Sequence, residues 1–125
     1  MKAKQQMILI AGPYRSGTGD DAELIAKNVA HMTETALHVY KMGHLPVLGE
    51  WFALPLLEAA GSRKTGDAIF NEFFHPVAIR LLSHCDAVLR IGGPSKGADE
   101  MMETGKQLQL QLYYSVDEIP IISTQ

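Results

Sequence analysis

Two short apolar runs that each end in a glycine-rich loop constrain the fold of this chain more than any other feature. The run "QMILIAG" predicts a buried parallel strand over residues 6–11, and it continues into the loop "GPYRSGTG". The run "DAVLRIGG" predicts a later strand, and it continues into the loop "GGPSKGAD". Each loop therefore connects a buried strand to whatever element follows it.

A helix with clear start and stop signals follows the first of these strands. Asp20 and Glu23 have the spacing of a capping box, so the helix should begin near Asp21. An apolar stripe at three- and four-residue steps runs along it to Val39, and Gly43 has the position of a helix stop.

The remaining elements complete an alternation of strands and helices. Proline is favoured in a first helical turn, so the His75–Pro76 step is expected to start or restart a helix that ends near His84. The other expected elements are strands at 45–48 and 110–114, a helix at 98–108 and a short fifth strand in "IPIIS". This alternation predicts a single α/β domain over residues 1–125. We expect a flavodoxin-like or Rossmann-like three-layer sandwich with about five mostly parallel strands in the order 2-1-3-4-5.

That strand order brings the two glycine-rich loops together. The first and third strands become neighbours, and the helices that follow them lie on opposite faces of the sheet. Ligands of such sheets bind in the crevice outside the carboxyl ends of these two strands. The crevice is therefore the expected site.

Side chains in both loops suit an anionic ligand such as a phosphate. Arg15 is able to bind it through two parallel hydrogen bonds, and Ser16 and Ser95 add hydroxyl groups. Tyr14 is placed to stack on a sugar or base. The glycines that would let the backbone and the following helix N-terminus approach the ligand are Gly12, Gly93 and Gly97. The alternative interpretation is that glycine and proline only form tight turns between strand and helix.

Two acids follow the second loop. Glu100 and Glu103 lie three residues apart, so they share one side of the expected helix. A carboxylate beside a bound phosphosugar could attack an anomeric carbon or stabilise an oxocarbenium-like centre. The alternative is that both acids only stabilise the helix N-terminus. His75 and Trp51 are further candidates for the pocket, and core packing is the competing interpretation for Trp51.

Composition and motif searches limit the class of partner. The net charge is −3, whereas domains that bind nucleic-acid polymers are usually basic. No apolar run approaches about 20 residues, so no membrane-spanning helix is expected. The single cysteine, Cys85, leaves no intrachain disulfide and favours a cytoplasmic protein. Neither loop matches GxxxxGK[ST] or GxGxxG, no histidine pair has metal-ligand spacing, and neither a cofactor nor a metal is expected.

Four motifs, in this order, resemble the nucleoside 2-deoxyribosyltransferase-like superfamily: "ILIAGPYRSG", "CDAVLRI", "PSKGADEMMETG" and "LQLYYSVDEIP". The superfamily includes deoxyribosyltransferases and deoxynucleoside 5′-monophosphate N-glycosidases. The chain is most similar to the small members that recognise a phosphate. In those members an arginine of the first loop and a serine of an S-x-G turn hold the 5′-phosphate, and these positions match Arg15 and Ser95.

The resemblance implies a flavodoxin-like fold, a homodimer or higher homo-oligomer, and a glutamate that cleaves the N-glycosidic bond of a (deoxy)nucleoside 5′-monophosphate. The family glutamate falls four residues after the glycine of the S-x-G turn, where this chain has Met101. Glu100 is one residue early and Glu103 two residues late, and one residue turns a helical side chain by about 100°. The aspartate that the family carries on the helix before the third strand is also missing, which leaves His75 or Glu72 in its place.

Two other functions are compatible with these residues. A displaced glutamate fits a non-catalytic module that binds a nucleotide or another phosphorylated metabolite. A phosphoribohydrolase of the cytokinin-activating type is a lesser alternative, because two extra residues separate Gly93 and Gly97 relative to its motif PGGxGTxxE.

Overall fold

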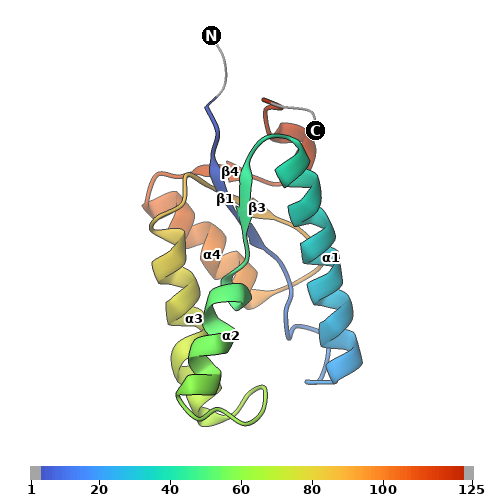
Figure 1. The fold of residues 1–125 in the computed structure, drawn as a ribbon, viewed down its shortest axis with the longest axis vertical. Coiled ribbons are helices and arrows are strands. Elements are labelled where there is room, and N and C mark those ends of the chain that lie inside the picture. Colours follow the sequence, from blue (N-terminus) through green and yellow to red (C-terminus); the bar gives the residue numbers. More distant parts are fainter. Residues whose placement is uncertain (1–3, 123–125) are drawn as a thin grey trace.

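Four parallel strands form the central sheet of the protein (Figure 1). The structure is a computed structural model, and it describes residues 4–122. The strands are β1 (Met7–Ala11), β2 (Leu45–Val47), β3 (Ala87–Arg90) and β4 (Gln111–Tyr113), and they lie in the order β2-β1-β3-β4. The α/β class and the order of the first four strands agree with the sequence prediction.

Helices cover both faces of this sheet. Successive side chains of a strand point to opposite faces. Ile8 and Ile10 of β1 therefore pack with α1 (Ala22–Lys41), while Leu9 and Ala11 pack with α3 (Ala68–Leu82) and α4 (Lys96–Gln107). The helix α2 (Gly49–Ala59) packs mainly against α3, and a short 3₁₀ helix, η1 (Val116–Glu118), follows β4. The helices that follow β1 and β3 thus lie on opposite faces, as the strand order requires.

The expected fifth strand does not form within the described residues. Residues 119–122 of "IPIIS" have no strand structure, and the last residue of that motif lies outside the described part of the chain. Pro120 has no N–H to donate to a sheet. The segment is instead held by the N–H of Ile122, which donates to the carbonyl of Met42 at 2.9 Å, and by the ring Nε2 of His44, which lies 2.6 Å from the Pro120 carbonyl oxygen.

The start of α1 matches the prediction to one residue. Asp21, rather than Asp20, is the N-cap, and its carboxylate accepts hydrogen bonds from the N–H groups of Glu23 and Leu24. Gly43 ends the helix with a φ of +104°, a conformation that favours glycine.

Two helices differ from the prediction. No helix was expected at α2, which contains Pro55 and has no cap formed by a side chain. The helix α3 begins at Ala68, and the His75–Pro76 step lies in its interior instead of at its start. Asp67 caps α3, because its carboxylate accepts a hydrogen bond from the N–H of Phe70 at 2.8 Å. The helix therefore begins before Pro76 and continues through it despite the helix-breaking tendency of proline. None of the helices within residues 4–122 has the length and apolar character to cross a membrane.

Candidate functional site

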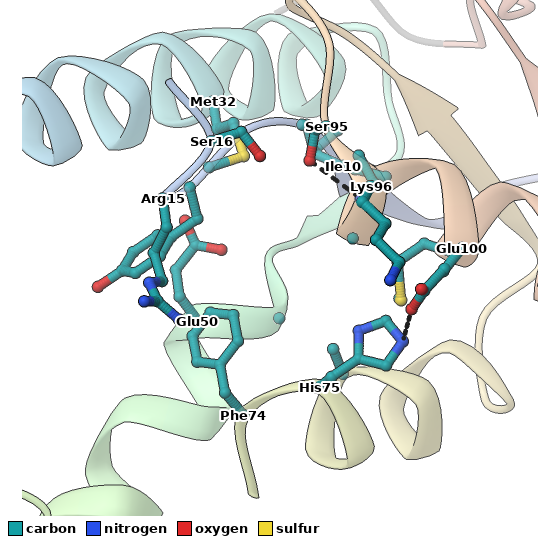
Figure 2. A pocket seen from close by; sticks show the side chains of 18 of the residues that line it. Ile10, Arg15, Ser16, Met32, Glu50, Phe74, His75, Ser95, Lys96 and Glu100 are labelled. Atoms are coloured by element: carbon teal, nitrogen blue, oxygen red, sulfur yellow. Dashed lines mark hydrogen bonds and ion pairs between the residues drawn. The ribbon is translucent and has the colours of Figure 1, made fainter. Parts of the chain in front are cut away.

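A cavity of about 360 Å³ opens at the carboxyl edge of the sheet. The loop after β1, the first turn of α2, the first three turns of α3 and the first turns of α4 line it (Figure 2). These segments meet because the parallel strands β1, β2 and β3 all end at this edge. The volume is in the range of pockets that bind small molecules.

The two glycine-rich loops lie directly against each other beside this cavity. A Cβ on Gly92 would stand 2.6 Å from Cδ of Pro13, and Gly92 has a φ of +78°. A Cβ on Gly12 would stand 3.0 Å from Cγ1 of Ile91. Glycine at these two positions therefore permits the contact between the loops. Of the predicted glycines, Gly12 and Gly97 line the cavity, whereas Gly93 does not, and its carbonyl accepts a hydrogen bond from Arg90 at 2.8 Å.

The first turn of α4 forms an electropositive wall of the cavity. Ser95 is buried and caps the helix, because its Oγ accepts from the N–H of Ala98 at 3.1 Å. The N–H groups of Lys96 and Gly97 belong to the first turn, where an α-helix offers no internal acceptor. The ammonium group of Lys96 forms no ion pair within residues 4–122, and its side chain points into the cavity in Figure 2. Lys96 was not among the predicted site residues.

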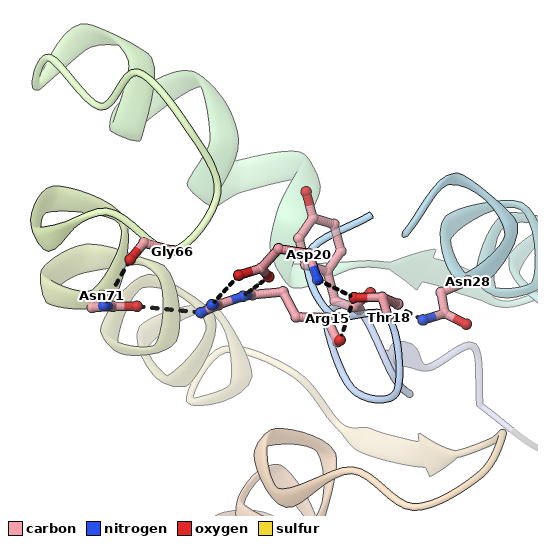
Figure 3. A network of polar contacts seen from close by, with 7 residues as sticks. Arg15, Thr18, Asp20, Asn28, Gly66 and Asn71 are labelled. Atoms are coloured by element: carbon pink, nitrogen blue, oxygen red, sulfur yellow. Dashed lines mark hydrogen bonds and ion pairs between the residues drawn. The ribbon is translucent and has the colours of Figure 1, made fainter. Parts of the chain in front are cut away.

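Arg15 lines the cavity, but much of its guanidinium is already engaged (Figure 3). Its Nε and Nη2 donate to the two carboxylate oxygens of Asp20 at 2.7 and 3.0 Å, and its Nη1 donates to Asn71 at 3.3 Å. The hydrogen bond to Asp20 raises the pKa of Arg15 and lowers that of Asp20. These contacts use three of the five guanidinium N–H groups and leave two for a ligand. Ser16 lies beside Arg15 on the same wall.

An aromatic cluster forms the wall next to Arg15. The rings of Phe70 and Phe74 stack at 4.7 Å between centroids, and the ring of Tyr14 lies 5.0 Å from that of Phe74. Burial, assisted by the nearby carboxyl of Glu50, raises the pKa of the Tyr14 phenol. Tyr14 was predicted from the loop, whereas Phe70 and Phe74 were missed because the helix that holds them was expected to begin at residue 75.

The structure separates the two rival glutamates of α4. Glu100 lines the cavity and pairs with His75, whose Nε2 lies 3.1 Å from its Oε2. Glu103 is exposed and does not line the cavity. The intervening Met101 is buried and lines the cavity. Asp99 is turned toward Arg90, with its Oδ1 3.1 Å from the Arg90 Nε.

Glu50 is a site residue that the sequence analysis missed. It follows β2 directly, in the first turn of α2, and only 6% of its surface is exposed. It lines the cavity, and its Oε2 has no hydrogen-bond partner in the described part of the chain. Burial raises the pKa of its carboxyl group. No local signal in "LGEW" distinguishes this acid from an ordinary one at a helix N-terminus.

Trp51, the residue predicted instead, does not line this cavity. One residue turns the helix by about 100°. Trp51 is therefore directed outward, is 45% exposed, and lies in a shallow groove with Arg80 and His84 on the outer side of α2 and α3.

Residues 4–122 contain no group of three or more His, Cys, Asp or Glu side chains placed to hold a metal ion. No protein-family model matches the chain, and no curated protein matches it.

Proposed function

We propose that the cavity binds a nucleoside 5′-monophosphate and that the protein is an N-glycosidase or deoxyribosyltransferase-like enzyme acting on its N-glycosidic bond. One observation carries this proposal: a single cavity combines an electropositive helix start, an aromatic wall and two carboxyl groups from different helices. A nucleotide offers a chemical match for each, namely a phosphate, a base and an anomeric carbon. The resemblance of the loop motifs supports the same assignment.

The phosphate is assigned to the first turn of α4. The N–H groups of Lys96 and Gly97, the Ser95 hydroxyl and the Lys96 ammonium group all suit an anion. The free N–H groups of Arg15 reach the same cavity from the loop after β1. An uncharged nucleoside would lose all of these contacts, so the 5′-phosphate should dominate binding.

The base is assigned to the aromatic wall. The rings of Tyr14 and Phe74 expose a stacking surface to the cavity, and stacking accepts any base. A base stacked there would hold the sugar between the two carboxyl groups. In the view of Figure 2, Glu50 lies on the side of Arg15 and Phe74, and Glu100 lies on the side of Lys96.

Glu100 is the α4 acid assigned to the anomeric carbon. In hydrolysis the C1′–N bond breaks, its electron pair goes to the base, and the oxygen of water bonds to C1′. A carboxylate beside C1′ stabilises the developing positive charge or bonds to it transiently. His75, 3.1 Å from Glu100, fixes the orientation of this carboxylate.

Base release tests the proposal directly. Purified protein is incubated with a panel of ribo- and deoxyribonucleoside 5′-monophosphates, and the free base is measured by chromatography. The same nucleosides without phosphate serve as the matched controls. We expect base release from at least one monophosphate and little from its nucleoside, and a panel without any free base would refute the enzymatic proposal.

A nucleotide-binding module without catalysis is the second candidate. It is favoured by Met101, a buried thioether at the position where the family carries its glutamate. This candidate predicts that a nucleotide raises the melting temperature and is recovered unchanged after prolonged incubation. Free base in that incubation would exclude it.

We further propose that the protein forms a homo-oligomer, as the family resemblance implies. Support comes from large apolar side chains exposed on the outer side of α2 and α3, which a second copy could cover: Trp51, Phe52, Leu56 and Phe73. Light scattering coupled to size-exclusion chromatography measures the mass. A monomer at micromolar concentration would contradict this expectation.

A further inference from the structure

One oxygen of the buried Glu50 carboxyl has no hydrogen-bond partner among residues 4–122. The residue is 6% exposed, and the oxygen without a partner is its Oε2. A buried polar atom without a partner destabilises the folded protein. A group of this kind in a ligand-sized cavity indicates that its partner is the ligand.

The fold places Glu50 there through a close contact between two helices. Gly49 begins α2 directly after β2, and a Cβ on Gly49 would stand 2.9 Å from the Cβ of Ala78 in α3. Glycine therefore brings the first turn of α2 against α3, beneath the cavity. A glutamate that served only the helix dipole would function equally well at the exposed surface, where ionisation costs less.

The surroundings of Glu50 favour its protonated form. Burial raises the pKa of its carboxyl, and only its own backbone N–H opposes this shift. The titratable and charged groups that share its cavity are Tyr14 and Arg15 from the loop after β1, His75 from α3, and Lys96 and Glu100 from α4. The Arg15 guanidinium is largely neutralised by its paired hydrogen bonds to Asp20. Glu50 thus differs from Glu100, which is half exposed and paired with His75.

We propose that Glu50 is the catalytic acid of this site and donates its carboxyl proton to a ring nitrogen of the departing base. The inference rests on the proposed N-glycosidase function and extends it with a role for a residue of α2. As the C1′–N bond breaks, the electron pair passes to the base, and the Glu50 proton neutralises the charge that develops there. Water supplies hydroxide to C1′, and its remaining proton passes through Glu100 to solvent. Solvent then reprotonates Glu50, which balances the cycle.

A pair of substrates separates proton donation from all other roles of Glu50. The first is the best nucleoside 5′-monophosphate of the panel. The second is 2-deoxyribose 5-phosphate with 4-nitrophenol at the anomeric carbon, whose leaving group departs without a proton. Glu50→Gln keeps the shape and removes the transferable proton, and Glu58→Gln at the exposed end of the same helix is the matched control.

We expect Glu50→Gln to lower kcat/KM for the nucleotide by about 10²- to 10⁴-fold and to leave nitrophenol release within a few-fold of the wild type. The wild-type profile should lose activity as the pH rises through the raised pKa of Glu50, above the ordinary glutamate value of about 4.3. This alkaline limb should be absent in Glu50→Gln. Because the other groups in the cavity are unchanged, the difference between the two profiles isolates Glu50.

Three results would overturn the inference, and they distinguish it from the proposed function. If Glu50→Gln releases base at the wild-type rate, as Glu58→Gln should, the role of Glu50 as catalytic acid is refuted and the proposed N-glycosidase function stands. Equal loss on both substrates also refutes it, because it assigns Glu50 to binding or folding. If the wild type releases no base, both the proposed N-glycosidase function and the role of Glu50 as its catalytic acid are refuted.

A second variant covers a failure of Glu50→Gln to fold, which its melting curve would show. Glu50→Asp retains a proton donor on a shorter chain. It should release base more slowly than the wild type while the alkaline limb persists. An aspartate variant without that limb would overturn the inference.

Discussion

Gly49→Ala tests whether the contact between α2 and α3 builds the floor of the cavity. The added Cβ would stand 2.9 Å from the Cβ of Ala78. Carbon atoms in favourable contact are about 3.5–4.0 Å apart, so the two helices must separate by about 0.6–1.1 Å. Overpacking of this kind costs about 1–3 kcal/mol, and the better helix propensity of alanine returns at most about 1 kcal/mol. We expect a net loss of about 1–2 kcal/mol.

Chemical denaturation followed by circular dichroism measures this loss, and in a domain of this size it corresponds to a fall in Tm of roughly 4–8 °C. The displaced first turn also carries Glu50. A shift of about 1 Å in a reacting group costs about 10²-fold in rate, so base release should fall well beyond the effect on stability.

The double variant with Ala78→Gly is the decisive control, because it removes the atom that the new Cβ would meet. Ala78→Gly alone should cost about 1–2 kcal/mol through helix propensity and the lost methyl group. With that methyl group absent, Gly49→Ala should cost little. A Gly49→Ala variant as stable as the wild type, or a coupling energy within about 0.5 kcal/mol of zero, would refute the reasoning.

Three further predictions concern single side chains. Lys96→Gln should weaken nucleoside monophosphate binding by about five-fold (~1 kcal/mol) in a calorimetric titration, while Lys106→Gln at the other end of α4 should leave it unchanged. Glu100→Gln should lower kcat/KM for base release by about 10²-fold or more, whereas Glu103→Gln should match the wild type, and equal losses in the two variants would contradict the assignment. Hydrogen bonds from the N–H groups of Phe70 and Arg63 hold the pKa of Asp67 well below its usual range, so its stabilising effect is full above about pH 4 and is lost as the pH falls further. Asp67→Asn should therefore be less stable than the wild type at pH 7, and the gap between their melting temperatures should narrow below pH 4.

The local signals of the sequence predicted the elements that define the crevice. The runs at β1 and β3 are continuously apolar because both faces of these strands are covered. The turn residues after each run mark the end of the strand. The position of α1 was predicted because the Asp20–Glu23 spacing, the apolar stripe and Gly43 all lie in the helix itself or beside it, although the cap is Asp21. These features predicted the strand order and the place where the two loops meet.

The positions of residues that depend on contacts with another helix or strand could not be predicted from local sequence signals. Pro76 indicated a helix start, yet the cap at Asp67 and packing against the sheet carry α3 through that position. Phe70 and Phe74 become a wall of the cavity only because α3 begins early. The fifth strand was expected from apolar residues in a segment whose backbone instead forms hydrogen bonds with Met42 and His44.

The sequence by itself therefore determined the parallel sheet, its first four strands and the glycine-rich loops at the carboxyl ends of β1 and β3. The tertiary structure decided which acids face that edge of the sheet. Glu100 and Glu103 are the same type of residue in the same helix, and they differ only in the side of α4 that each occupies. Glu50 differs from an ordinary surface glutamate only in its burial. Ala78 and Tyr14, residues of two other segments, line the same cavity as Glu50. The cost of a buried carboxylate oxygen without a partner arises only when these segments fold together.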